Sequence, residues 1–191
     1  LLKYFFIVLA ENLFFWIPEK KKRIVLYVHA RKGYTCNPKY IAEYLLTHYP
    51  GQYELIWASD YPETCIYLET KGMRVIKSKT MQHFYYVMTA NVNITNDFFL
   101  FNKRKQLSIN TWHGGGAYKK SGMAILNNRY SLERFIHQLT YRYTNYIVSS
   151  SEMFTRIGLE TFGLPEQQFL PIGMPRNDIF FLETECVMRN I

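Results

Sequence analysis

The chain has 191 residues, of which 48% are hydrophobic and 20% are charged. This length and composition exclude a disordered protein and allow one large domain with a full core. The formal net charge of +8 suggests an anionic partner: a nucleic acid, a phosphate-rich polymer or a membrane surface. The cysteines are few and widely spaced (Cys36, Cys65 and Cys186), which excludes a disulfide framework or CxxC zinc site and favours a reducing cytoplasm.

Residues 1–18 are predicted to form an apolar amphipathic helix, which a basic run at residues 20–23 follows. The apolar stretch is shorter than the roughly 20 residues of a membrane-spanning helix, and Glu11 would lie at depth. Two interpretations remain open. The helix lies in a membrane interface with the basic run on anionic headgroups, or it packs on its own domain and the charged run is solvated.

Residues 19–175 alternate between strand and helix patterns. Strands are predicted at 23–29, 53–58, 73–76, 92–95, 106–112, 146–149 and 168–172. Between them, helices are predicted from Asn37 as cap with Pro38 at the first position, at 62–70, after Thr80 as cap, over 132–143, and after a capping box formed by Ser149 and Glu152. This order predicts an α/β fold, a Rossmann-like parallel sheet flanked by helices.

In such a sheet, ligands bind beyond the carboxyl ends of the strands. Polar, basic and glycine residues follow several predicted strands: His29, Asn96, Asp97, His113, Gly114, Gly115, Gly116, Lys119, Lys120 and Arg176. Asp97 can support a base or bind a sugar hydroxyl, although solvated loop acids are commoner. His29 has a structural alternative, a hydrogen-bonded histidine near the core.

The sharpest pattern is the segment 111–120, which places a histidine, three glycines and two lysines directly after a strand. Glycines let the backbone approach a ligand, and their N–H groups can form an anion-binding nest to which Lys119 and Lys120 add charge. His113 is placed to accept a proton from a hydroxyl near neutral pH. Each feature alone is commonly structural; their combination at the ligand-binding edge favours a catalytic base beside a phosphate site.

Several other chemistries are disfavoured. The chain has no GxGxxG or GK[ST] phosphate loop and no GxSxG nucleophile motif. No pair of histidines has metal-ligand spacing, so no protein-bound catalytic metal is predicted. His48, His83 and His137 fall within helical patterns and are predicted to be structural.

Four segments together resemble the CDP-glycerol glycerophosphotransferase family, whose members polymerise teichoic acid backbones. They are residues 37–41 (NPKYI), 53–57 (YELIW), 110–114 (NTWHG) and 173–178 (GMPRND). The resemblance implies the N-terminal, acceptor-side half of a GT-B transferase. Residues 176–191 are then expected to begin the crossover to a second domain. The chain opens on Leu1 and stops at Ile191, which is consistent with a fragment that would be inactive or nearly so alone.

By the family pattern, His113 resembles the catalytic base that deprotonates the acceptor's terminal hydroxyl, which attacks the β-phosphorus of CDP-glycerol and expels CMP. The resemblance also implies a CDP-glycerol or related CDP-polyol donor, a polyanionic lipid-linked acceptor, an anionic membrane surface at the cytoplasmic face, and no cofactor. Many members continue with Thr-Pro-Leu-Lys after WHG, whereas this chain has residues 115–119 (GGAYK), which leaves the polyol and acceptor open.

Two alternatives remain. A nucleotide-sugar glycosyltransferase of the same fold would differ only in its donor. A non-catalytic basic module would bind phosphate polymers or RNA through stacked tyrosines. The tyrosines mostly fall at core spacing and no RNA-binding motif is present, so a nucleic-acid partner is not expected.

Overall fold

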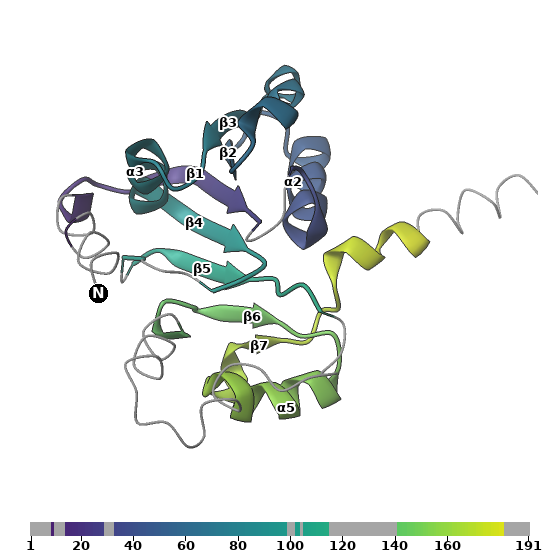
Figure 1. Cartoon of the computed structure of the whole chain (residues 1–191). Coiled ribbons are helices and arrows are strands. Elements are labelled where there is room, and N and C mark those ends of the chain that lie inside the picture. The colour runs from purple at the N-terminus through teal and green to yellow at the C-terminus, as the bar shows by residue number, and fades with distance from the viewer. Residues whose placement is uncertain are drawn as a thin grey trace, which may run out of the picture.

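The computed structural model describes residues 9, 14–28, 33–98, 102–103, 105–114 and 141–181. Figure 1 shows strand arrows that run in one direction through a single sheet. Its order is β3-β2-β1-β4-β5-β6-β7, and every neighbouring pair is parallel. The predicted parallel α/β sheet is therefore confirmed.

The strands are short and lie close to the predicted positions. Their bounds are β1 Lys20–Tyr27, β2 Glu54–Ser59, β3 Arg74–Lys77, β4 Ala90–Thr95, β5 Leu107–Asn110, β6 Tyr146–Val148 and β7 Phe169–Leu170. The basic run at residues 20–23 thus belongs to β1, which begins three residues before the predicted strand. The chain order reverses between β1 and β4, which is the point where ligands bind in doubly wound sheets.

Among the described residues, three longer helices cover the sheet: α2 Cys36–His48, α3 Met81–Thr89 and α5 Glu152–Phe162. Short 3₁₀ segments lie at η1 Pro62–Thr64, η2 Ile66–Lys71, η4 Glu166–Gln168 and η5 Pro175–Asn177. The helix predicted over 62–70 is therefore two 3₁₀ turns, and the second ends at the left-handed Gly72. Most of the helix predicted over 132–143 lies outside the described residues.

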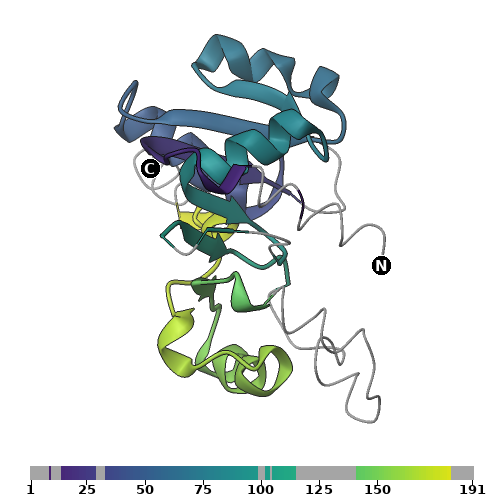
Figure 2. The same cartoon turned by 90° about the vertical axis from the view of Figure 1, so that its left-hand side faces the viewer.

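Alternation along β1 and β2 divides the core between the two faces of the sheet. Val25 and Ile56 pack with Val87 of α3 on one face. Leu26 and Trp57 pack with Ala42 of α2 on the other. Successive strand residues point to opposite faces, so both faces need a helical cover. Figure 2 shows the part of the sheet around β1 and β2 above the region of β6, β7 and α5. That region has a third hydrophobic cluster of its own.

Two predicted helix caps are wrong by a few residues. The cap of α2 is Thr35, and Asn37 lies inside the helix with its side chain fully buried. The cap of α5 is Ser151, whose hydroxyl accepts a hydrogen bond from the Phe154 N–H, while the Ser149 hydroxyl donates to the Ser151 carbonyl. The Thr80 cap of α3 is confirmed, because its side chain accepts from the His83 N–H.

The amino-terminal segment is described from Phe14 onward, apart from Leu9. Phe14 packs edge-on against Tyr85, and the Lys103 ammonium donates to the Ile17 carbonyl at 2.5 Å. Phe15 and Trp16 are exposed, Trp16 by 84%. Part of this segment therefore packs on the domain while two aromatic rings face outward. Within the described part of the chain, no helix has both the length and the apolar character to cross a bilayer.

Candidate functional site

The candidate site lies where the chain leaves β4 and β5. These neighbouring strands end at Thr95 and Asn110, which are paired in register. Because the strands are parallel, the residues that follow them meet at one edge, and Nδ1 of His113 lies 2.9 Å from the Asn96 carbonyl oxygen. The structure thus brings together two of the predicted site residues from separate loops.

This contact fixes the proton on the imidazole of His113. A carbonyl oxygen can only accept a hydrogen bond, so Nδ1 carries the proton and donates it. Nε2 then holds the lone pair of the neutral ring and is the nitrogen that can take up a proton. The residue is exposed, and its ring stacks on Trp112 with centroids 4.7 Å apart. An exposed imidazole held in this orientation is suited to general-base chemistry.

Trp112 makes the turn that carries His113 away from the strand direction. Its φ of +53° lies in the left-handed region, which costs a non-glycine residue about 1–3 kcal/mol. Two contacts offset that strain. The Trp112 N–H donates to the Asn110 side-chain oxygen at 2.8 Å, and the indole packs on Phe162 with ring centroids 4.9 Å apart. Backbone strain held by surrounding contacts is common at functional sites.

Asn37 and Arg176 brace the same turn from two distant parts of the sequence. The Asn37 amide nitrogen donates to the carbonyls of Thr111 and Trp112, both at 2.9 Å. Its amide oxygen accepts from the Arg176 backbone N–H at 3.2 Å, and the Arg176 guanidinium donates to the His113 carbonyl at 3.0 Å. Figure 1 shows the yellow segment after β7 reaching the end of α2 at this edge.

Asp97 lies at the same edge and is partly buried. Its carboxylate accepts from the Phe98 N–H at 2.8 Å, and its own N–H donates to the Thr95 hydroxyl. Burial, with the Asp97 carboxylate nearby, raises the pKa of Tyr141 to about 12 and also raises that of Tyr27. Both phenols therefore stay protonated near neutral pH. These contacts make Asp97 part of the loop scaffold, beside its predicted substrate role.

The remaining predicted residues divide into two groups. Gly114 follows His113 and is partly exposed at the site. Five others lie outside the described residues: His29, Gly115, Gly116, Lys119 and Lys120. The bracing contacts of Asn37 were not predicted from the sequence. One signal for them was Thr35, a good capping residue two positions earlier, which leaves the Asn37 side chain free for another contact.

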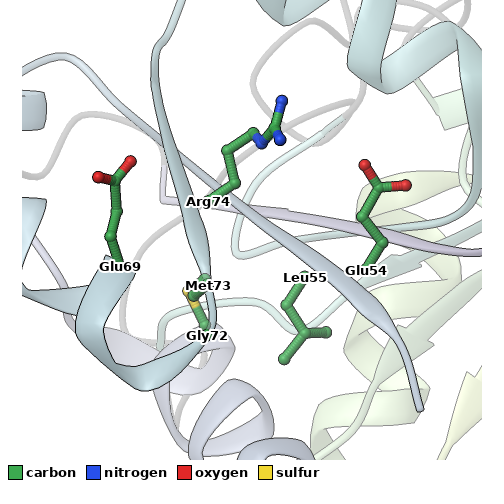
Figure 3. Close-up of a pocket in the computed structure, with 6 residues that line it drawn as sticks. All are labelled: Glu54, Leu55, Glu69, Gly72, Met73 and Arg74. Atoms are coloured by element: carbon green, nitrogen blue, oxygen red, sulfur yellow. The ribbon is translucent and has the colours of Figure 1, made fainter. Parts of the chain in front are cut away.

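A separate open hollow of about 340 Å³ lies at the opposite edge of the sheet (Figure 3). Its lining comes from the amino ends of β2 and β3 and from the end of η2, and includes Glu54, Glu69 and Arg74. In Figure 3 the two carboxylates stand on either side of Arg74. Glu54 is also held by Arg23, with two nitrogen–oxygen distances of 3.0 Å. The hollow is thus remote from His113 and does not belong to the candidate site.

No group of three or more His, Cys, Asp or Glu residues able to hold a metal ion occurs within the described ranges. The absence of a catalytic metal stays a prediction, since part of the loop after Gly114 lies outside those ranges.

The fold is a Rossmann-like parallel sheet, and an exposed histidine lies at the edge where ligands bind in such sheets. The chain belongs to the CDP-Glycerol:Poly(glycerophosphate) glycerophosphotransferase family, whose model matches residues 9–191. The resemblance noted from the sequence motifs is therefore confirmed.

Curated relatives agree with this membership. The chain is 27% identical over 173 residues to a teichoic acid poly(glycerol phosphate) polymerase of Staphylococcus epidermidis, covering 84% of this chain and 23% of that protein. It is 31% identical over 139 residues to the teichoic acid glycerol-phosphate primase of Bacillus subtilis, covering 67% of this chain and 35% of that protein. The chain thus spans about a quarter to a third of these relatives.

Solved structures of the wall teichoic acid polymerase TagF share the fold. One superposes with a TM-score of 0.75 at 24% identity, covering 94% of this chain and 47% of that one. A variant of TagF soaked with CDPG gives a TM-score of 0.76 over the same share. Matching one half of this GT-B-like polymerase confirms the predicted fold class.

Proposed function

We propose that this chain forms the acceptor-side part of a glycerophosphotransferase of teichoic acid synthesis. The enzyme transfers a polyol phosphate from CDP-glycerol, or a related CDP-polyol, to the hydroxyl end of a lipid-linked teichoic-acid-like acceptor. The observation that carries the proposal is the exposed His113 imidazole, whose Nδ1–H is held by the Asn96 carbonyl in a member of this family. Family membership favours a CDP-activated polyol over a nucleotide sugar as donor.

In the proposed reaction, Nε2 of His113 removes the proton from the acceptor hydroxyl. The oxygen then forms a bond to the β-phosphorus of the donor, the bond from that phosphorus to the bridging oxygen breaks, and CMP leaves. The Asn96 carbonyl keeps the ring oriented and stabilises the imidazolium that forms. Phosphoryl transfer depends mainly on positioning and on neutralising charge, and a base at this edge adds the removal of the acceptor's proton.

Positive charge and backbone N–H groups would hold the phosphates. Arg176 uses one guanidinium nitrogen on the His113 carbonyl and is partly exposed, so its remaining N–H groups can reach an anion. The other substrate contacts are proposed to come from Gly114, Gly115, Gly116, Lys119, Lys120, Asn96, Asp97 and His29. The net charge of +8 supports a polyanionic acceptor.

The amino-terminal segment is proposed to hold the enzyme peripherally on the cytoplasmic face of the membrane. Phe15 and Trp16 are exposed just before Lys20, Lys21 and Lys22, which are exposed too. Aromatic rings beside lysines suit an interface rich in anionic headgroups.

In the proposed organisation, residues 1–18 are the membrane segment, residues 19–175 are the acceptor-side domain, and residues 176–191 are the crossover to a donor-binding domain. Without that donor-binding domain the chain is proposed to be inactive.

The test is His113→Ala in the full-length protein, with CMP release from CDP-glycerol as the readout. Loss of a general base lowers turnover by roughly 10²- to 10⁴-fold, while donor affinity stays nearly unchanged. His48→Ala is the matched control, because His48 is an exposed histidine at the far end of α2 that bonds only locally to the Tyr44 carbonyl. Turnover of His113→Ala equal to that of the control would remove His113 as the base.

A further inference from the structure

We propose that Asn37 is the positioning residue for His113, holding the turn that presents the imidazole. This inference rests on the proposed function of His113. The Asn37 side chain is fully buried, and both ends of its amide are used. It joins residues 74 and 139 positions away in the sequence. One small side chain thereby ties α2, the turn after β5 and the segment after β7 together.

Helix capping does not account for Asn37. Thr35 occupies the capping position of α2, and the Asn37 side chain reaches out of the helix to the two carbonyls of Thr111 and Trp112. Those carbonyls follow the end of β5, so they have no partner strand residue within the register of β4 and β5. Buried carbonyls need donors, and Asn37 supplies one N–H to each.

The donors lie at the strained point of the turn. Trp112 has a left-handed backbone conformation. The carbonyls of Thr111 and Trp112 belong to the two peptide units that flank it, and their orientation sets the direction in which the chain continues to His113. Asn37 binds those carbonyls directly, and Arg176, whose backbone N–H is bound to Asn37, grips the next carbonyl, that of His113. Three consecutive carbonyls are thus held from one side. The His113 ring is then oriented by its bond to Asn96.

Only an amide of this length satisfies all three partners. It presents two N–H donors and one acceptor from a single rigid group. An aspartate is isosteric and still accepts from the Arg176 N–H, but it turns an oxygen toward two carbonyl oxygens at 2.9 Å. Asn37→Asp therefore keeps the link to η5 and breaks the link to the His113 turn.

The experiment compares Asn37→Asp with the wild type in the full-length protein. We expect kcat to fall roughly 10- to 100-fold with KM for CDP-glycerol changed less than 3-fold, because displacing a catalytic group by about 1 Å has effects of this size. The second readout is ¹⁵N NMR of the His113 side chain, where the signature of the Nδ1–H tautomer is expected to be lost or broadened. Asn37→Ser, which removes the amide without adding charge, takes its place if Asn37→Asp does not fold.

Asn93→Asp is the matched control. Asn93 is also fully buried, and its amide donates to the Val87 carbonyl at 3.3 Å, away from the turn after β5. This variant is expected to lose a similar amount of stability while the kcat of its folded fraction and the His113 signals stay unchanged. If Asn37→Asp behaves like Asn93→Asp in both readouts, Asn37 is merely structural and the inference is overturned.

The two readouts separate this inference from the proposed function. Altered His113 signals in Asn37→Asp, together with full turnover in His113→Ala, would support the positioning contact and reject His113 as the base. Unaltered His113 signals would reject the positioning role whatever the activity shows.

Discussion

Two histidines of this chain have opposite environments. His113 is exposed and hydrogen-bonded to a carbonyl. His83 is buried in α3, and its ring makes an edge-to-face contact with the ring of Tyr27. Nδ1 of His83 accepts from the Lys79 N–H at 3.2 Å, and Nε2 has no hydrogen-bond partner among the residues that the structure describes. Burial lowers the pKa of His83 to about 4, against a smaller opposing effect of the Asp60 carboxylate.

We expect His83 to make stability depend on pH in the acid range. A depressed pKa means that the unfolded chain binds more protons between pH 6.5 and about 4, so the free energy of unfolding is highest above pH 6.5 and falls through that window. The free energy of unfolding of His83→Phe, measured with denaturant across this pH window, tests the prediction, because the variant has no titratable group at position 83. Its slope is expected to be flatter than that of wild type, and His48→Phe should keep the wild-type slope. Equal slopes in all three proteins would contradict the prediction.

At still lower pH, the protonation of Glu54 lowers the free energy of unfolding further. Hydrogen bonds from Arg23 lower the pKa of Glu54, so the stabilisation from this pair is present above the ordinary carboxyl range and is lost as the pH falls below it. The pair is partly solvent-screened, because 39% of the Glu54 side chain is exposed. Its effect is therefore expected to be smaller than that of His83.

At the level of elements, α5 approaches β7 more closely than a side chain would allow. Gly158 lies in the middle of α5, and a Cβ there would lie 2.5 Å from a ring atom of Phe169. Phe169 is itself buried, so its ring has little room to move. The glycine is present for packing, although it lowers the intrinsic helix propensity of α5.

Gly158→Ala is expected to destabilise the protein. Alanine gains about 1 kcal/mol in helix propensity, but overpacking a filled core costs about 1–3 kcal/mol, so the net effect is a loss of roughly 1 kcal/mol. Thermal or urea unfolding measures it. Glu160→Ala, on the exposed face of the same helix, should change stability by less than about 0.5 kcal/mol. A Gly158→Ala protein more stable than wild type would show that the α5–β7 contact is looser than described.

For the whole molecule, the positive charge and the exposed aromatic rings predict that the amino-terminal segment binds an anionic membrane surface. Replacing Phe15 and Trp16 together by serine removes two outward rings without opening the core, because both side chains are largely exposed. We expect weaker binding to vesicles that contain phosphatidylglycerol, and binding that falls with added salt in wild type.

Met153→Ser combined with Ile172→Ser is the control for vesicle binding, since these side chains are 71% and 68% exposed elsewhere on the surface. Cosedimentation with vesicles measures all three proteins. If the control loses as much binding as the Phe15 and Trp16 variant, or if neither loses any, the amino-terminal segment is not the membrane contact.

Local sequence patterns predicted the elements well where they are strongly periodic. Runs rich in β-branched residues gave every strand within a few residues of its bounds. Patterns were weaker where several conformations compete. The segment 62–70 carries helix-forming residues but forms two 3₁₀ turns, and Ser151 rather than Ser149 caps α5, since adjacent serines offer equivalent caps.

By itself, the sequence determined the α/β class, the edge of the sheet that carries the polar residues and, through four short segments, the family. These follow from local periodicity and from motifs, which are readable along the chain. Only the tertiary structure decided that the Asn37 side chain reaches from α2 to the Trp112 carbonyl, and that the Asn96 carbonyl sets which ring nitrogen of His113 donates. Those bonds join loops far apart in sequence, and their geometry exists only once parallel strands bring the loops to one edge.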